Sequence, residues 1–265
     1  MSLPSPGSDR AAIVTGASSG IGAAIARELV RHGHQVVLVA RSADKLRTLA
    51  DEIGAGAHVV PADLSDPAAR AGLLDAVTSI GVVPDVLINN AGFSTLGPVH
   101  RGDPDADVNM LEVDVVAVAD LCARFLPGMV SRSRGAVLNV SSTAAFQPLP
   151  GQAAYAAGKA FVLLYTQALA GELRGTGVSV TALCPGPTAT RFFNRAGFDR
   201  PDRAFPRILW KDVDYVARAA IDGLDRGRLV VIPGAANRVS AVLAHLTPRS
   251  VLLPILARGH PALRR

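Results

Sequence analysis

Short apolar runs alternate along the chain with longer segments of helical character, and this alternation is what most constrains the fold. The apolar runs have the length of buried strands and cover residues 11–15, 35–40, 58–61, 85–89, 135–140, 178–183 and 228–232. Helical patterns stand between them at residues 23–31, 44–53, 106–132 and 152–174, with a further helix expected from residue 67. Strands that alternate with helices are typical of one parallel sheet covered on both faces. We therefore predict the α/β class, with a doubly wound parallel sheet of about seven strands.

The composition indicates a large folded core and argues against nucleic acid as a partner. Of the 265 residues, 49% are apolar and 18% are charged, which is typical of a globular protein. Lysine and arginine exceed aspartate and glutamate by 27 − 22 = 5. We interpret this excess as spread along the chain, with a contribution from the arginine-rich end. A nucleic-acid-binding protein concentrates its basic residues in a patch or stripe. We therefore predict no nucleic-acid partner.

The cysteines, histidines and termini indicate a cytoplasmic protein without a metal. Cys122 and Cys184 stand apart from each other, and the six histidines form no ligand-like cluster. We therefore predict neither a zinc site nor a disulfide framework, which fits a reducing compartment. Residues 1–10 contain no apolar segment typical of a signal peptide. No run reaches the roughly 18 apolar residues that identify a membrane span.

A glycine-rich turn joins the first predicted strand to the first helix. It reads Gly16-Ala17-Ser18-Ser19-Gly20-Ile21-Gly22. Glycines permit a tight turn and the close approach of a ligand, and the helix N-terminus offers N–H groups to a pyrophosphate. The spacing differs from Gly-x-Gly-x-x-Gly, so a turn without a ligand is the alternative. We predict that a dinucleotide contacts Gly16, Ser18, Ser19, Gly20, Ile21 and Gly22.

The end of the second strand predicts which dinucleotide is preferred. An acidic side chain at this point hydrogen-bonds the 2′-hydroxyl of NAD, whereas this chain has Arg41. A guanidinium suits a 2′-phosphate, so we predict that NADP(H) is favoured over NAD(H). The alternative is that Arg41 is only a solvated residue at a helix start. Asp63 and Leu64 follow the third strand, where we expect contact with the adenine, and Asp66 is expected to cap the next helix.

Tyr155 and Lys159 form a candidate acid/base pair. They lie four residues apart in the helical run 152–174, so their side chains face the same side. A lysine charge near a phenol favours the phenolate and lowers a pKa that is otherwise about 10. Such a phenol passes a proton to or from a substrate oxygen. The spacing alone is common on solvated helix faces, so it needs support from the rest of the chain.

Five motifs occur together in an order that is specific to one enzyme family. They are Thr15-Gly16-Ala17-Ser18-Ser19-Gly20-Ile21-Gly22, Asn89-Asn90-Ala91-Gly92, Asn139-Val140-Ser141-Ser142, Tyr155-x-x-x-Lys159 and Pro185-Gly186. With them the chain closely resembles the short-chain dehydrogenase/reductase family over residues 10 to 233. Within that family it looks most like NADP-preferring ketoreductases of bacterial type. The resemblance implies a Rossmann-like fold and hydride transfer between NADP(H) and an alcohol or carbonyl substrate.

The resemblance also implies the roles of the site residues. Tyr155 is expected to be the general acid/base, Lys159 to lower its pKa and bind the nicotinamide ribose, and Ser142 to orient the substrate oxygen. Ser142, thirteen positions before Tyr155, fits better than Ser141, which strand alternation points the other way. The remaining cofactor contacts are expected from two segments at strand ends, which contain Asn90, Ala91, Gly92, Pro185, Gly186, Thr188 and Thr190.

Asp114 departs from the family's pattern. The family usually has an asparagine in the long central helix, which helps to hold a water near the lysine, and this chain has Asp114 at the matching position. Aspartate cannot donate an N–H, and its charge near Lys159 changes a coupled titration. We include Asp114 among the catalytic residues and expect it to retune the pH optimum rather than to abolish activity.

The segments between the motifs set the expectations for substrate and assembly. Residues 143–151 and 191–205 are rich in aromatic and apolar side chains, which suits an apolar lid over a hydrophobic carbonyl compound. Packing in the core or in an interface is the alternative. Residues 234–265 are expected to form an amphipathic pair of helices, for which we favour protein contact over a membrane surface. Packing through the two long helices, common in the family, implies a homo-oligomer, either a dimer or a tetramer.

These expectations combine into one prediction of domains and function. Residues 1–9 are a flexible N-terminus, residues 10–233 a single Rossmann-like catalytic domain, and residues 234–265 a C-terminal helical extension. The predicted activity is that of an NADP(H)-dependent oxidoreductase acting on a small alcohol or carbonyl substrate. The alternative is a catalytically impaired NADP(H)-binding protein of the same fold. A nucleotide-sugar epimerase is disfavoured, because the chain lacks a large C-terminal substrate domain.

Overall fold

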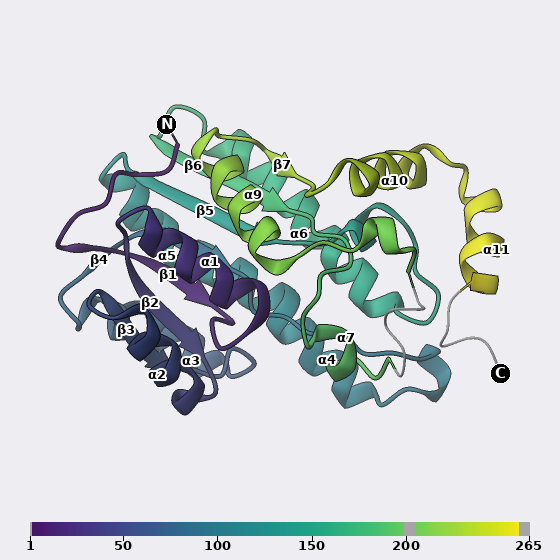
Figure 1. Ribbon diagram of the computed structural model, residues 1–265, viewed down its shortest axis with the longest axis horizontal. Coiled ribbons are helices and arrows are strands. Elements are labelled where there is room, and N and C mark those ends of the chain that lie inside the picture. Colours follow the sequence, from purple (N-terminus) through teal and green to yellow (C-terminus); the bar gives the residue numbers. More distant parts are fainter. Residues whose placement is uncertain (1, 199–204, 260–265) are drawn as a thin grey trace.

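A parallel sheet lies at the centre of the computed structural model, which describes residues 2–198 and 205–259 (Figure 1). Its seven strands stand in the order β3-β2-β1-β4-β5-β6-β7, and each neighbouring pair is parallel. The strands are β1 (Arg10–Thr15), β2 (Gln35–Ala40), β3 (Ala57–Pro61), β4 (Val83–Asn89), β5 (Gly135–Val140), β6 (Val178–Leu183) and β7 (Val230–Val231). The prediction of a doubly wound, Rossmann-like parallel sheet is confirmed.

The strand order reverses beside β1. The chain adds β2 and β3 on one side of β1 and then crosses to β4 on the other side. The carboxyl ends of β1 and β4 therefore flank the point of reversal, which is where parallel sheets of this kind bind ligands. Two of the predicted site segments, residues 16–22 and 90–92, follow these two strands directly.

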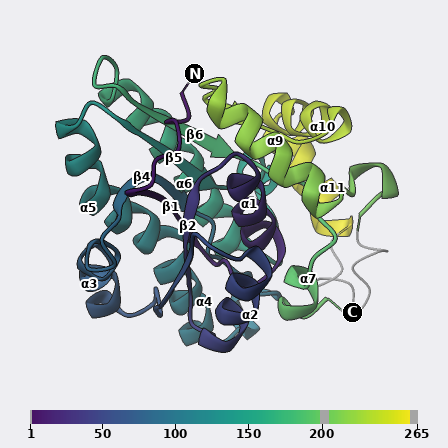
Figure 2. The same cartoon turned by 60° about the vertical axis from the view of Figure 1, so that its left-hand side comes forward.

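Helices cover both faces of the sheet (Figures 1 and 2). One face carries α1 (Gly20–Arg31), α2 (Ala43–Ile53) and α9 (Val213–Asp225); the other carries α3 (Pro67–Thr78), α5 (Ala117–Ser131) and α6 (Ala153–Glu172). The remaining helices are α4 (Pro104–Leu111), α7 (Phe192–Arg195), α10 (Ala235–Leu246) and α11 (Arg249–Gly259). Short 3-10 turns are η1 (Val99–Arg101), η3 (Thr143–Phe146) and η4 (Arg207–Leu209).

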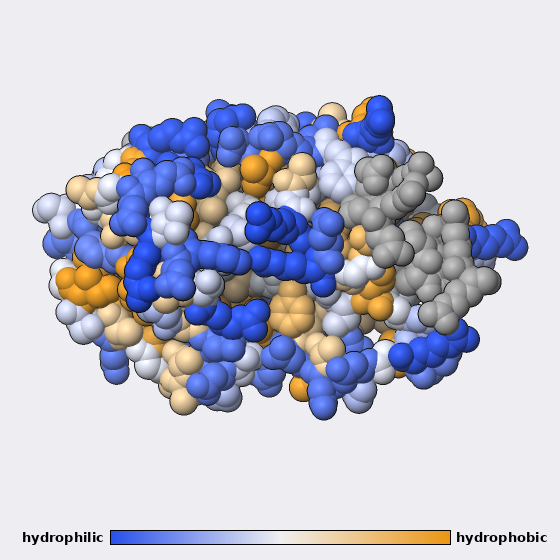
Figure 3. All heavy atoms as spheres, turned by 60° about the horizontal axis from the view of Figure 1, so that its bottom comes forward, coloured by the Kyte–Doolittle hydropathy of each residue, from blue (hydrophilic) through white to orange (hydrophobic). Residues whose placement is uncertain are grey.

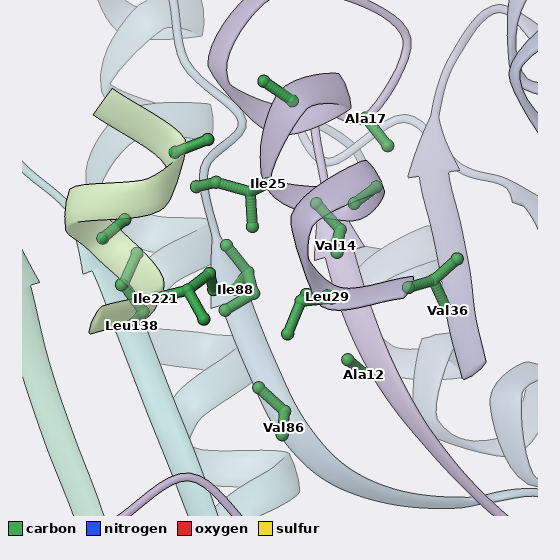
Figure 4. Packing of buried hydrophobic residues seen from close by; sticks show 14 of the residues in the cluster. Ala12, Val14, Ala17, Ile25, Leu29, Val36, Val86, Ile88, Leu138 and Ile221 are labelled. Carbon is green, nitrogen blue, oxygen red and sulfur yellow. The ribbon is translucent and has the colours of Figure 1, made fainter. Parts of the chain in front are cut away.

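The two faces of the sheet form two separate cores. Ala12 and Val14 of β1 pack with α1 and α9, whereas Ala11 and Ile13 of the same strand pack on the opposite face. This alternation follows from the period of two in a strand. Figure 4 shows the first core, in which Ile25 and Leu29 of α1 lie over the sheet. The outer surface differs: on the face shown in Figure 3, hydrophobic residues lie in separate patches among hydrophilic ones.

The long helix predicted at residues 106–132 is interrupted. A π-helical turn, η2 (Glu112–Val116), separates α4 from α5. Pi-helical turns inside α-helices frequently mark functional sites, and this one contains Asp114. Pro127 and Gly128 lie inside α5 rather than ending it, and the buried Leu126 and Met129 beside them pack on the core.

Most other element boundaries agree with the predictions within a few residues. The Asp66 side chain accepts a hydrogen bond from the Ala68 N–H, as expected of a helix cap. The final strand is shorter than the predicted residues 228–232, because only Val230 and Val231 pair with β6. The expected pair of C-terminal helices is present as α10 and α11; the part of the predicted extension at residues 260–265 lies outside the described residues.

Candidate active site

The glycine turn after β1 is folded so that two of its residues adopt positive φ angles. Gly16 has a φ of 65° and Gly20 a φ of 60°, a region that disfavours side chains. Helix α1 begins at Gly20, and its cap Ser19 makes no side-chain hydrogen bond among the described residues. The first N–H groups of α1 therefore keep their capacity to bind an anion.

Asn90 holds this turn against the end of β4. Its side-chain amide donates to the Thr15 carbonyl at 2.9 Å, while the Thr15 hydroxyl accepts from the Asn90 N–H at 2.9 Å. A Cβ atom on Gly16 would lie 2.8 Å from both the Asn90 amide nitrogen and the Ala91 Cα atom. The two strand ends are thus in contact, and they leave no room for a side chain at Gly16.

Arg41 and Asp63 face each other at the ends of β2 and β3. The guanidinium lies 4.0 Å from the carboxylate, and the Arg41 side chain is 70% exposed. The N–H and hydroxyl of Ser65 donate to the Asp63 carboxylate at 3.0 and 2.8 Å. Burial disfavours the charge, but these bonds and Arg41 outweigh it, so the pKa of Asp63 lies below its usual value. Arg41 is thus accessible at the strand end where the cofactor preference was predicted to be decided.

Ser142, Tyr155 and Lys159 come together at the end of β5. The Lys159 ammonium lies 5.8 Å from the centre of the Tyr155 ring and donates to the Val140 carbonyl at 3.1 Å. The Ser142 hydroxyl bonds to Tyr155 and accepts from the Ala144 N–H. Ser141 points away and donates to the Lys159 carbonyl at 2.7 Å, so it anchors α6 instead. The alternation predicted for the two serines is therefore present.

Asp114 is buried beside Lys159 and forms an ion pair with it. The carboxylate lies 2.9 Å from the ammonium, and both side chains are at most 5% exposed. Its other oxygen accepts from the Phe93 N–H at 3.0 Å. A Cβ atom on Gly92 would lie 2.9 Å from the carboxylate. The π-helical turn thus directs Asp114 to the lysine and to the loop after β4 at once.

Burial is the largest influence on the pKa values of Asp114, Tyr155 and Lys159. It raises the pKa of Tyr155 above its ordinary 10.0, although the Lys159 charge and the Ser142 hydroxyl act in the opposite direction. The expected lowering by Lys159 is therefore present as a contribution, but the prediction of a net lowering is wrong. Burial also raises the pKa of Asp114 against the pull of Lys159. Burial opposes the charge on Lys159, but Asp114 and Tyr155 raise its pKa.

The loop after β6 reaches back to the glycine turn. The Thr188 hydroxyl donates to the Gly186 carbonyl at 3.0 Å. A Cβ atom on Gly20 would lie 3.3 Å from a methyl carbon of Thr190. The loop that begins at Pro185 therefore lies against the start of α1 at Thr190 and Gly20, which brings together predicted cofactor residues of the two segments.

An aromatic cluster begins beside Tyr155. The Tyr155 and Phe192 rings lie 5.7 Å apart, and Phe193 contacts Phe198, Phe205 and Trp210 at 5.3 to 5.4 Å. Phe192, Phe193, Phe198 and Phe205 belong to the predicted lid at residues 191–205, of which residues 199–204 lie outside the described residues; Trp210 follows that segment. In the other predicted segment, Phe146 packs with core residues of β6 and α6. The alternative of core packing therefore applies to Phe146.

Two buried polar residues at the site were not predicted. Asn237 of α10 donates to the Leu209 and Pro233 carbonyls at 3.0 and 2.9 Å, and a Cβ atom on Gly186 would collide with its side chain. Arg70 of α3 is 4% exposed and donates to the Leu64 carbonyl at 2.7 Å. A lone asparagine or arginine in a helix gives no sequence signal for such contacts.

The described cysteines are buried, and no candidate metal-binding cluster is found among the described residues. Cys122 and Cys184 are buried free thiols, and burial raises the pKa of each to about 12. Within residues 2–198 and 205–259, no group of three or more histidine, cysteine, aspartate or glutamate side chains is arranged to hold a metal ion. In the same part of the chain, no helix combines the length and apolar character needed to cross a membrane.

Comparison with known proteins identifies the family. A sequence model of short chain dehydrogenases matches residues 10–200. A short chain dehydrogenase of Pseudocercospora fijiensis (strain CIRAD86) is 42% identical over 67% of this chain and 59% of the relative. The NADP-dependent 3-hydroxy acid dehydrogenase YdfG of Salmonella typhi is 34% identical over 72% of this chain and 77% of the relative. The chain therefore belongs to the short-chain dehydrogenase/reductase family.

The solved structures agree with this assignment. A short-chain dehydrogenase from Sphingobium yanoikuyae in complex with NADPH matches with a TM-score of 0.78 and 34% identity, over 92% of this chain and 95% of that chain. The matches to the first two curated relatives span 59% and 66% of their lengths. The family and the oxidoreductase fold are thus established, whereas the activity of the whole protein is a matter for proposal.

Replacement of Gly22 by alanine tests the close packing of the turn. A Cβ atom at this position would lie 2.6 Å from the Gly16 carbonyl oxygen and collide with the Asn90 side chain. We expect Gly22→Ala to lower the free energy of unfolding by about 1–3 kcal/mol through overpacking. Urea denaturation of the wild type and the variant measures this difference in the free energy of unfolding. The control is Gly72→Ala in α3, where the added carbon has open space and a gain of about 0.5–1 kcal/mol is expected. A Gly22 variant as stable as the wild type would contradict the packing.

Proposed function

We propose that this protein is an NADP(H)-dependent oxidoreductase that interconverts an alcohol and a ketone or aldehyde, with Tyr155 as the general acid/base. The observation that carries the proposal is the meeting of Ser142, Tyr155 and Lys159 beside the glycine turn. The family membership supports the reaction class, and the NADPH bound by one similar structure supports the cofactor. Cytoplasmic location, a homo-oligomeric state and a single catalytic domain over residues 10–233 belong to the same proposal.

The residues at the strand ends fit a dinucleotide phosphate cofactor. Gly16 and Gly22 let the turn pack tightly against Asn90, where a Cβ atom would collide, and the start of α1 offers N–H groups for the pyrophosphate. In the proposal, Arg41 binds the 2′-phosphate, Asp63 and Leu64 border the adenine, and Lys159 binds the nicotinamide ribose. When bound, the nicotinamide ring supplies or accepts the hydride.

The protein's own residues handle the proton. In the reductive direction Ser142 holds the substrate oxygen, and Tyr155 gives its phenolic proton to that oxygen. Because burial raises the pKa of Tyr155, the phenol is protonated at neutral pH and ready to donate. Lys159 keeps its charge through Asp114 and favours the phenolate that remains after transfer. In this protonation state the phenol can serve as the general acid in carbonyl reduction.

The surroundings of Tyr155 favour an apolar substrate. Met110, Ala144 and Ala156 are buried with it, and Phe93, Leu149 and Phe192 pack against this group. Carbon atoms therefore face the place where a substrate would meet the phenol. Burial of apolar substrate surface against these side chains favours binding, and it excludes water from the hydride transfer. We propose a hydrophobic carbonyl compound on this basis.

Asp114 supports the alternative function, an NADP(H)-binding protein with impaired catalysis. Its carboxylate forms an ion pair with the Lys159 ammonium at 2.9 Å, and its charge opposes formation of the Tyr155 phenolate. The three other catalytic candidates are present and brought together. We therefore keep catalysis as the leading proposal, and the variants below distinguish the two.

Removal of the phenol tests the role of Tyr155. We expect Tyr155→Phe to lower kcat for carbonyl reduction by about 10²–10⁴-fold, since the positioned proton donor is lost, and to spare NADPH affinity. The matched control is Tyr165→Phe, ten residues later on α6 with its hydroxyl 3.5 Å from the Ala119 carbonyl, which should retain activity. Steady-state kinetics and fluorescence titration of NADPH measure both. Substantial residual turnover in Tyr155→Phe would refute the assigned role.

Replacement of Arg41 tests the cofactor preference. We expect Arg41→Ala to weaken NADPH binding by about 10–100-fold, the value of one or two charge-assisted hydrogen bonds, and to leave NADH binding unchanged. Arg47→Ala is the control, because Arg47 lies on the same segment, is 65% exposed and pairs with Asp44. Isothermal titration of the wild type and both variants with each cofactor gives the six affinities. Equal losses for NADPH and NADH would contradict a 2′-phosphate contact.

Replacement of Asp114 tests the retuned titration. The Asp114 charge raises the pKa of Tyr155, so Asp114→Asn should lower that pKa. Reductase activity, which needs the protonated phenol, is lost as the pH rises through the Tyr155 pKa; in the variant this loss should begin at lower pH. Asp105→Asn, an exposed carboxylate on α4, is the control. If the profiles of kcat against pH coincide for the wild type and Asp114→Asn, Asp114 does not set the Tyr155 pKa and the proposal is contradicted.

A further inference from the structure

The C-terminal helices carry their larger apolar side chains on the outside. On α10 the buried residues are Asn237, Ala241 and Ala244, so small side chains form the face against the domain. The solvent face carries exposed Val239 (58%), Val242 (54%), Leu243 (59%) and Leu246 (72%). These four follow the spacing i, i+3, i+4, i+7 of one helix face. Valine and leucine are usually buried and alanine fills little volume, so this outward stripe is the apolar face that needs a partner.

Helix α11 also exposes large apolar side chains. Val251 (52%), Leu253 (41%) and Ile255 (60%) are exposed, whereas Leu252 is buried. The two helices lie next to each other at one end of the molecule, away from α2 and β3 (Figures 1 and 2). Together, the tail surface consists of Val239, Val242, Leu243, Leu246, Val251, Leu253 and Ile255.

The charged residues of the C-terminal region are all basic. Residues 226–265 contain seven arginines, no lysine and no acidic residue. The rest of the chain holds 27 − 7 = 20 basic and 22 acidic residues, a net charge of −2. The whole positive excess therefore lies in the last forty residues, and the expectation of a charge spread along the chain is wrong. On α10, exposed Arg238 directly precedes Val239 and lies at the border of the apolar stripe.

We propose that the tail surface docks on a membrane that carries anionic lipids. An apolar stripe bordered by basic residues is the pattern of a helix that lies in the membrane interface. Exposed Arg238 beside the stripe, together with the positive excess of residues 226–265, complements anionic headgroups, which attract basic segments close to the membrane. A second copy of this surface would face it with like charges, which disfavours self-association here. The preference for protein contact formed on the sequence is therefore reversed.

The tail surface is fixed to the domain rather than loosely attached. The Arg249 guanidinium donates to the Ala244 carbonyl at 3.2 Å and to the Phe146 carbonyl at 3.4 Å. Phe146 ends the η3 turn, which is capped by Ser142. Asn237 holds α10 to the Pro233 and Leu209 carbonyls. Docking would therefore bring the side of the molecule next to Ser142 toward the lipid.

Vesicle sedimentation of the full chain tests the proposal. We expect the protein to pellet with phosphatidylcholine vesicles that contain phosphatidylglycerol, and to pellet much less with phosphatidylcholine alone or at high salt. The variant Val242→Ser with Leu246→Ser should lower the affinity for the mixed vesicles by about tenfold or more, since two exposed apolar side chains lose their burial in lipid.

A matched double variant elsewhere provides the control. Val99→Ser with Leu229→Ser replaces one valine and one leucine, 66% and 41% exposed, on η1 and just before β7; it should bind like the wild type. Circular dichroism checks that both variants are folded. The proposal is overturned if the wild type does not bind the mixed vesicles, or if both variants lose affinity equally. It is also overturned if the Val242/Leu246 variant dissociates a homo-oligomer in light scattering and keeps its vesicle binding.

Discussion

The buried ion pair between Lys159 and Asp114 is the interaction on which the site depends. Burying two charges costs several kcal/mol each, and this cost is offset only where the pair is close and further hydrogen-bonded. Here the lysine also donates to the Val140 carbonyl, and the aspartate accepts from the Phe93 N–H. The pair therefore joins α6, the π-helical turn, the end of β5 and the loop after β4 at one point.

The parallel sheet supplies the second constraint, because it brings distant segments to one edge. Thr15 and Asn90 are seventy-five residues apart in sequence but exchange hydrogen bonds at the ends of β1 and β4. Their contact closes the glycine turn and fixes the start of α1. The loop after β6 reaches the same place through Thr190 and Gly20. The space proposed for the cofactor is therefore bounded by three strand ends that the sheet order sets side by side.

Features with a local cause were predicted from sequence, and features with a distant cause were not. The strands at residues 35–40, 135–140 and 178–183 agree with the structure, because a buried apolar run is a local signal. The π-helical turn depends on partners of Asp114 in α6 and in the loop after β4, which no local pattern reveals. The contact of Asn237 with Gly186 and the burial that raises the pKa of Tyr155 are likewise products of tertiary structure.

Transfer of an isotope from labelled cofactor tests the proposed function most directly. The protein would be mixed with NADPH deuterated at the transferable position of its nicotinamide ring and with a panel of apolar ketones, aldehydes and acyl thioesters. Mass spectrometry would then follow the products. The proposal predicts an alcohol that carries deuterium at the former carbonyl carbon of at least one substrate. Tight NADPH binding without transfer of deuterium to any member of the panel would contradict it and favour the binding protein.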